Sequence, residues 1–274
     1  MPKQKKARIK KETKKANLLK FLKRSRIPKL PKIQKSHTVL LGLACAFFLW
    51  LFWGIPLPTQ LGRDPVVSTK IFDRNGALIY EFFDDQKRDP VKLVDLPEYV
   101  KEATIAIEDK DFYSHYGFSP FGMARAAYKT IFKGKLEGGS TLTQQLVKNS
   151  LLSPERTIRR KAQEFILASI VELRYGKDQI LEMYLNQIPY GSTAYGIGSA
   201  SELYFGKSAK DLTLSEATLL AGLPQRPSAY SPFGARPELA KDRQHAVLRR
   251  MVEDGHLTQE EADKAEKEEL KFAS

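Results

Sequence analysis

The sequence predicts a mainly α-helical domain with a small β element, preceded by one transmembrane helix. From Pro97 onward, apolar residues recur at helical spacing in successive segments, several of which end at glycine. Earlier in the chain, two short runs rich in β-branched and aromatic residues flank Arg74-Asn75-Gly76, which is typical of a β-hairpin. The third observation is that no charged residue occurs between Lys35 and Arg63.

The transmembrane helix is predicted over residues 37–57. The run from Thr38 to Ile55 is almost wholly apolar, and about 18–20 such residues cross a bilayer as a helix. Trp50 and Trp53 lie near its distal end, where amphipathic rings favour the membrane interface. A cleaved signal peptide and a buried core helix are the alternatives. The long basic segment before the run and the lack of a small-residue cleavage site after it favour a retained anchor.

The N-terminal segment 1–36 is a basic tail. Its first 35 residues hold 15 of the 45 Lys and Arg and a single acid, Glu12, whereas the rest of the chain carries 30 basic and 31 acidic residues. By the positive-inside rule, the tail lies in the cytoplasm and the folded domain lies outside the plasma membrane, which the chain crosses once. Anionic membrane lipids are therefore the expected partners of the tail, in place of nucleic acid.

The remaining chain is expected to form a linker, one folded domain and a short C-terminal segment. Residues 58–65 are the linker, residues 66–265 are the domain, and residues 266–274 are a C-terminal tail or a truncated linker. The single cysteine, Cys45, lies in the apolar run, so the domain has no disulfide. The four histidines of the chain are scattered and offer no metal-binding cluster.

Two segments place polar residues at predicted helix ends. The first, from Glu108-Asp109 to Gly117, follows an apolar helix, so its carboxylates can be partly desolvated and suited to acid–base chemistry. The second, 138–149, begins with Gly-Gly, and Thr141 and Gln144 have the spacing of a capping box. Free N–H groups at such a helix start suit anionic or sugar oxygens. A solvated helix end and an ordinary capped helix are the alternatives.

Two further segments follow these. Arg156, Arg160 and Glu164 can share one helical face, and an acid among cations suits diphosphate chemistry because cations hold a leaving phosphate. A surface ladder of salt bridges is the alternative. In the segment 177–186 the apolar side chains lie on one face, which indicates core packing.

Taken together, in this order and spacing, the four segments resemble the motifs of the peptidoglycan glycosyltransferases (glycosyltransferase family 51). These enzymes occur alone or as the N-terminal domain of bifunctional penicillin-binding proteins. The motif ED-x-x-F-x-x-H-x-G stands at 108–117, GGST-x-TQQ at 138–145, RK-x-x-E at 160–164 and ILE-x-YLN at 180–186. The resemblance covers residues 66–265.

The resemblance implies a lysozyme-like fold and a reaction that polymerises lipid II, a disaccharide-pentapeptide carried on a polyprenyl diphosphate. The growing lipid-linked glycan is the donor, the product linkage is β-1,4, and the anomeric centre inverts as polyprenyl diphosphate leaves. No cofactor is required and no residue is a dedicated metal ligand, although Mg or Mn can assist at the diphosphate. A cell-wall synthesis complex is a further expected partner.

By motif match, Glu108 and Glu164 are the expected catalytic residues. Glu108 would take the proton from the 4-hydroxyl of the acceptor, and Glu164 would position the acceptor or assist departure of the diphosphate. The expected substrate-binding residues are Lys148, Arg156, Arg160, Lys161, Ser140, Thr141, Gln144, Gln145, Asn149, Asp109, Phe112 and His115. A lysozyme-like muramidase and a non-catalytic membrane scaffold are the alternatives. The cations favour the transferase, since glycan hydrolysis has no diphosphate to bind.

Two expectations concern the rest of the chain. Aromatic and cationic residues are interleaved between Phe118 and Lys135, which is typical of a segment in the lipid headgroup region. An ordinary amphipathic helix packed on the core is the alternative. No serine is followed by lysine three positions later, and K-T-G is absent. The chain is therefore expected to form glycan strands without cross-linking them, and not to be acylated by β-lactams.

Overall fold

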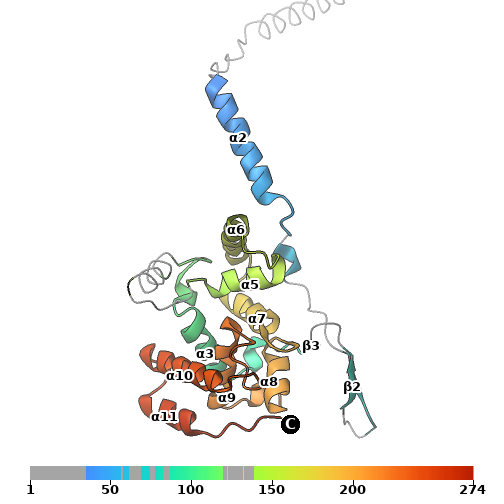
Figure 1. Ribbon diagram of the computed structural model, residues 1–274, viewed down its shortest axis with the longest axis vertical. Coiled ribbons are helices and arrows are strands. Elements are labelled where there is room, and N and C mark those ends of the chain that lie inside the picture. The colour runs from blue at the N-terminus through green and yellow to red at the C-terminus, as the bar shows by residue number, and fades with distance from the viewer. Residues whose placement is uncertain are drawn as a thin grey trace, which may run out of the picture. The chain divides into compact units, whose positions relative to one another are not determined.

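The computed structural model divides into two compact units (Figure 1). It describes residues 35–56, 58–61, 69–74, 78–82, 87–119, 122, 132 and 139–273. One unit comprises Met1–Leu51 and the other comprises Phe52–Ser274. The second unit contains all the residues that the sequence assigns to a site.

The first unit is described by helix α2 (Lys35–Phe52). Its exposed apolar side chains include Val39, Leu40, Leu41, Leu43, Phe47, Phe48 and Leu49. Among the helices of the described residues, none combines the length and the apolar character needed to cross a membrane. The transmembrane helix over 37–57 stays a prediction, and residues 1–34 of the basic tail lie outside the described residues.

The second unit is mainly helical, as the sequence predicts. Its α-helices are α3 (Glu98–Glu108), α5 (Leu142–Leu151), α6 (Ile158–Arg174), α7 (Lys177–Gln187), α8 (Ile197–Phe205), α9 (Leu214–Gly222), α10 (Glu238–Glu253) and α11 (Gln259–Lys267). Short 3₁₀ helices are η1 (Pro58–Gln60), η2 (Leu93–Asp95), η3 (Phe112–Ser114), η4 (Ala209–Asp211) and η5 (Leu223–Gln225). The lysozyme-like character that the family resemblance implies stays a prediction.

Two small sheets accompany the helices. Strands β1 (Thr69–Phe72) and β2 (Leu78–Phe82) pair antiparallel, which confirms the expected β element, while residues 75–77 between them lie outside the described residues. The second sheet has the order β3-β5-β4, formed by Lys87–Arg88, Ala194–Tyr195 and Pro189–Gly191. The sequence did not predict this sheet, because strands of two or three residues are too short to show an alternating pattern.

Side-chain caps set the beginning of several helices. In α5, the Thr141 hydroxyl accepts from the Gln144 N–H, and the Gln144 side chain accepts from the Thr141 N–H, which confirms the predicted capping box. The same reciprocal pair begins α9 at Thr213 and α11 at Thr258. These caps satisfy N–H groups that have no partner within the helix.

The core of the second unit fixes the relative positions of α3, α5, α6 and α7. The predicted apolar face of α7, Ile180, Leu181, Tyr184 and Leu185, is fully buried and shares one cluster with side chains of the other three helices. Helices α3, α9 and α10 lie side by side (Figure 1). A second cluster joins them through small side chains, among them Ala103 and Ala221, which let the helices approach closely. The C-terminal end of α3 is therefore held between α5 on one side and α10 on the other.

Candidate active site

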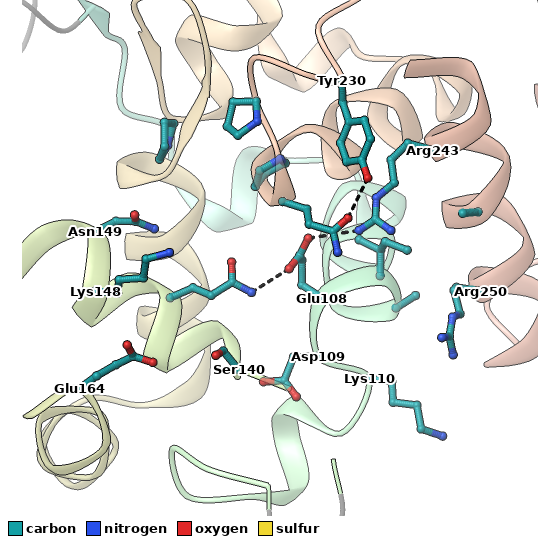
Figure 2. A pocket seen from close by; sticks show the side chains of 18 of the residues that line it. Glu108, Asp109, Lys110, Ser140, Lys148, Asn149, Glu164, Tyr230, Arg243 and Arg250 are labelled. Atoms are coloured by element: carbon teal, nitrogen blue, oxygen red, sulfur yellow. Dashed lines mark hydrogen bonds and ion pairs between the residues drawn. The ribbon is translucent and has the colours of Figure 1, made fainter. Parts of the chain in front are cut away.

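A cavity of about 640 Å³ lies at the C-terminal end of α3 (Figure 2). The charged and amide side chains that line it are Glu108, Asp109, Lys110, Gln145, Lys148, Asn149, Arg160, Lys161, Glu164, Gln225, Arg243, Arg249 and Arg250. A neighbouring cavity of about 750 Å³ shares Lys148, Asn149, Arg160 and Lys161 with the first and adds Arg156. The two cavities therefore form one cationic depression around a few carboxylates.

Glu108 is the last residue of α3, and its side chain is only 8% exposed. Its Oε2 accepts a hydrogen bond of 2.7 Å from Gln145 Nε2, whereas Oε1 has no hydrogen-bond partner among the residues that the structure describes. The guanidinium of Arg243 lies 3.5 Å from Oε1 (Figure 2). One carboxylate oxygen is thus held by an amide, and the other lies buried beside the guanidinium of Arg243.

The surroundings of Glu108 favour its protonated form. Burial raises the pKa of its carboxyl and the negative charge of Asp109 adds to the rise, whereas the bond from Gln145 and the charge of Arg243 oppose it, and the pKa stays above its usual value. Burial, with a contribution from Glu108, also raises the pKa of the Tyr184 and Tyr190 hydroxyls. A carboxylate with raised proton affinity in a cavity is suited to accept a proton from a bound molecule.

Asp109, His115 and Phe112 hold the chain behind Glu108. The Asp109 carboxylate lies 2.9 Å from His115 Nε2 and accepts a 3.0 Å bond from the N–H of Leu142, the first residue of α5. Phe112 is fully buried, and the Lys177 ammonium lies 4.5 Å from the centre of its ring. Phe112 and His115 line neither of the two cavities. His115 acts on the site through the Asp109 carboxylate, which does line the main cavity.

Thr141 and Gln144 are buried in the cap of α5 and do not line the two cavities. The Thr141 hydroxyl also donates a 2.8 Å bond to the carbonyl of Gly117. Gly117 has φ 82°, and a Cβ there would lie 2.9 Å from backbone atoms of Ala168. These contacts join the end of the first motif to the start of the second, whose Gly138 lies outside the described residues.

Glu164 is buried on α6 beneath two cations. Its side chain is 2% exposed, pairs with Arg160 at 3.4 Å and accepts a bond from Lys161. Lys161 also donates a 3.0 Å bond to the hydroxyl of Ser140. The carboxylate therefore fixes both cations at the cavity wall. The predicted shared helical face is confirmed for Arg160 and Glu164, whereas Arg156 lies before α6 begins at Ile158.

Lys148, Asn149 and Arg156 are exposed at the cavities. Within the part of the chain that the structure describes, Lys148 and Arg156 make no hydrogen bond or ion pair. Their charges are available to an anionic group in the depression.

The motifs did not include the opposite wall, which α10 and the loop before it provide. Arg243, Arg249 and Arg250 line the cavity, and Tyr230 donates a bond of 3.1 Å to Gln225 nearby (Figure 2). Arg243, Ala246 and Arg250 recur at helical spacing beside the buried face of α10. This spacing was the one sign in the sequence that α10 has a basic face. It does not indicate which element that face packs against.

Comparisons with known proteins agree on one family. A family model described as transglycosylase matches residues 75–252. The chain is 44% identical over 209 residues to penicillin-binding protein 1A of Neisseria gonorrhoeae, which covers 76% of this chain and 26% of that protein. It is 45% identical over 196 residues to penicillin-binding protein 1F of Bacillus subtilis, covering 71% of this chain and 27% of that protein.

A third relative matches more of the chain. Penicillin-binding protein 1A of Vibrio cholerae is 40% identical over 253 residues, which covers 91% of this chain and 30% of the relative. The chain thus spans less than a third of the length of these relatives. The crystal structure of penicillin-binding protein 1A from Haemophilus influenzae matches with a TM-score of 0.44 and 26% identity, over 77% of this chain and 22% of that one.

Proposed function

The chain belongs to the transglycosylase family, and from this premise we propose that it is a peptidoglycan glycosyltransferase that polymerises lipid II into β-1,4 glycan strands. One observation carries the proposal. Glu108 lines a cavity together with Lys148 and Arg160, and Oε1 of its buried carboxylate has no hydrogen-bond partner among the described residues. A proton acceptor and an anion-binding wall are the two features that this transfer needs.

Glu108 acts as the general base in the proposed reaction. Its Oε1 takes the proton of the acceptor 4-hydroxyl, and the acceptor oxygen forms a bond to the anomeric carbon of the donor glycan. The bond from that carbon to the diphosphate breaks, and its electron pair leaves with polyprenyl diphosphate. Attack opposite the leaving group inverts the anomeric centre. The raised pKa of the buried carboxyl supports this role.

The leaving diphosphate binds on the side of α5 and α6. Lys148 and Arg156 supply charges without a partner among the described residues, and phosphate oxygens form short, charge-assisted bonds with such groups. Arg160 and Lys161 complete this wall. Glu164 assists departure indirectly, because its buried carboxylate orients both cations.

The other expected binding residues divide into two sets. Ser140, Gln145 and Asn149 line the main cavity and can contact sugar or phosphate oxygens. Phe112, His115, Thr141 and Gln144 support the chain around Glu108, and Asp109 does so while also lining the main cavity. The described residues include no group of three or more His, Cys, Asp or Glu that could hold a metal ion. A divalent ion, Mg or Mn, would be bound by the diphosphate oxygens.

We further propose that the apolar segment 37–57 anchors the chain in the plasma membrane, with the site on the outer side. A substrate with a polyprenyl chain is confined to the bilayer, so an anchored enzyme meets it there. The exposed apolar side chains of α2 and the basic tail before it support the proposal, as does attraction between that tail and anionic lipids. Membrane-bound protein that resists a carbonate wash, together with a protease-accessible domain on the outer side, is the expected result.

Polymerisation of lipid II by the detergent-solubilised full chain tests the function. We expect glycan strands to form, with one polyprenyl diphosphate released for each new glycosidic linkage. New reducing ends from preformed glycan would identify a muramidase instead, and absence of turnover would identify a scaffold. A cell-wall synthesis complex, the further partner expected for the family, would be sought by cross-linking in intact cells.

A further inference from the structure

Arg243 lies on the cavity wall opposite α5, and no motif of the sequence includes it. Its guanidinium lies 3.5 Å from Glu108 Oε1, and its Nε donates a 3.4 Å bond to the carbonyl of Gly222 at the end of α9. The same guanidinium lies 5.8 Å from the centre of the Tyr230 ring. The end of α9 and the Tyr230 ring thus hold a largely buried cation beside the Glu108 carboxylate.

Packing between α9 and α10 directs the Arg243 side chain toward Glu108. A Cβ added at Gly222 would lie 2.7 Å from Arg243 Cγ, which is closer than two carbon atoms can approach without movement. The glycine therefore leaves the space through which the arginine crosses the end of α9. Cγ belongs to the root of the side chain, so a larger residue at 222 would displace the whole guanidinium.

Besides burial, a few neighbouring side chains affect the ionisation of the Glu108 carboxyl. Gln145 from α5 donates to Oε2, Asp109 adds a negative charge from the next residue, and Tyr184 and Tyr190 face Glu108 from α7 and β4. Burial and Glu108 itself keep both tyrosine hydroxyls protonated, so they contribute no charge. Among the described residues, Arg243 is the cation that acts on this carboxylate.

We propose that Arg243 is a positioning residue for the base: its charge opposes the effect of burial on Glu108, and its guanidinium holds Oε1 in place. This inference rests on the proposed function, because it assigns a task within that reaction. The cation lies beside the oxygen that Gln145 leaves free, so its attraction orients the carboxylate while the amide anchors the other oxygen. Arg243 acts through Glu108 and need not touch the substrate.

The pH dependence of kcat/KM for lipid II polymerisation tests the proposal. An opposite charge within about 4–6 Å shifts a carboxyl pKa by roughly one unit or more. In Arg243→Gln we expect the acidic limb of the profile to move upward by about one pH unit or more. The rate should fall about tenfold on that limb and return toward the wild-type rate at alkaline pH. Arg243→Lys keeps the charge and should restore most of the limb.

Two further variants complete the experiment. Lys241→Gln removes an exposed cation from the same helix and should leave the profile unchanged. Gly222→Ala keeps Arg243 but displaces its guanidinium. We expect the acidic limb of the pH profile to move upward by less than it does in Arg243→Gln. A melting curve of each variant establishes that it is folded at the assay temperature.

The outcomes separate this proposal from the function on which it rests. If Arg243→Gln is slower by the same factor at every pH and the limb stays in place, Arg243 does not position the base. If Arg243→Gln melts below the assay temperature, Gly222→Ala takes its place. An acidic limb that stays at the wild-type pH in Gly222→Ala would then show that Arg243 does not position the base. Failure of the wild-type chain to polymerise lipid II would refute the proposed function itself.

Discussion

Glu108 is the residue on which the proposed chemistry depends most directly. Glu108→Gln keeps the size of the side chain and removes the proton acceptor, so we expect polymerisation to fall about 100-fold or more. Glu98→Gln, an exposed change on the same helix, is the matched control, because its ion pair with Lys101 lies at the surface and contributes little. Near wild-type turnover in Glu108→Gln would remove Glu108 from the mechanism.

The same substitution has a consequence for stability that depends on pH. Burial raises the pKa of Glu108 in the folded state, so the folded protein loses stability as the pH rises through that pKa, whereas glutamine does not ionise. Glu108→Gln should therefore melt at a higher temperature than wild type at pH 8. The difference should vanish below the unfolded pKa of about 4.3. A variant that is less stable at pH 8 would show that the attraction of Arg243 outweighs burial.

Lys148 and Arg156 test the anion-binding wall. Each substitution to alanine removes charge-assisted bonds worth about 1.5–3 kcal/mol, so kcat/KM should fall roughly 10- to 100-fold. The melting temperature should stay near that of wild type, because neither side chain has a partner among the described residues. Lys210→Ala, a change at an exposed lysine away from the cavities, serves as the control. Loss of stability without a kinetic defect would make the residue structural.

At this scale the sequence could indicate Glu108 and the cations of α5 and α6, because they fall in short motifs with recognisable spacing. It could not indicate Arg243. That side chain reaches Glu108 only because small residues let α10 pack closely on α3, and a contact across more than a hundred residues leaves no local pattern. Thr141 and Gln144 were expected at the cleft, yet the structure places them in the cap, and their binding role stays a prediction.

At the scale of elements, the cap of α5 sets the geometry of the site. Thr141→Ala removes the bond to the Gln144 N–H and the bond to the Gly117 carbonyl, and loss of a cap alone costs about 0.5–2 kcal/mol. We expect a lower melting temperature and a lower kcat, because the start of α5 also binds Asp109 beside Glu108. Thr141→Ser keeps the hydroxyl and should restore both quantities.

Thr258→Ala is the matched control for this prediction. Thr258 caps α11 with the same reciprocal pair, but α11 contributes nothing to the two cavities. We expect it to lose stability by a similar amount and to keep its kcat below the melting range. Equal kcat losses in the two variants would mean that activity follows global stability and not the cap of α5.

The helices and strands differ in how well the sequence predicts them. Long helices could be predicted because their periodicity extends over several turns, as the buried face of α7 shows. The cap of α5 could be predicted from the spacing of Thr141 and Gln144. The β1–β2 pair followed from its β-branched residues and the Asn75-Gly76 pair. In the sheet β3-β5-β4, strand β3 lies about a hundred residues before its partner β5, and all three strands are too short to show an alternating pattern.

At the scale of the whole molecule, the excess positive charge and the candidate site residues lie in different parts of the chain. The basic excess lies in the first 35 residues, whereas the family match at 75–252 and every candidate site residue lie in the unit Phe52–Ser274. The core of that unit draws on side chains from Ile55 onward. Folding of the site should therefore depend on the second unit alone, and the first should decide where the enzyme works.

A chain that begins at Phe52 tests this separation. We expect it to melt within a few degrees of the full chain and to polymerise detergent-solubilised lipid II, while its association with membranes falls. A chain that begins at residue 66 is the informative comparison, because it lacks Leu61, which is buried in the core, and the carbonyl of Pro58 that accepts a bond from Tyr175. Losing a buried leucine costs about 1.5–3 kcal/mol, so this shorter chain should melt several degrees lower. If both chains melt at the temperature of the full chain, residues 52–65 contribute nothing to the core. If the chain that begins at Phe52 does not fold, the first unit is required for stability, and folding of the site does not depend on the second unit alone.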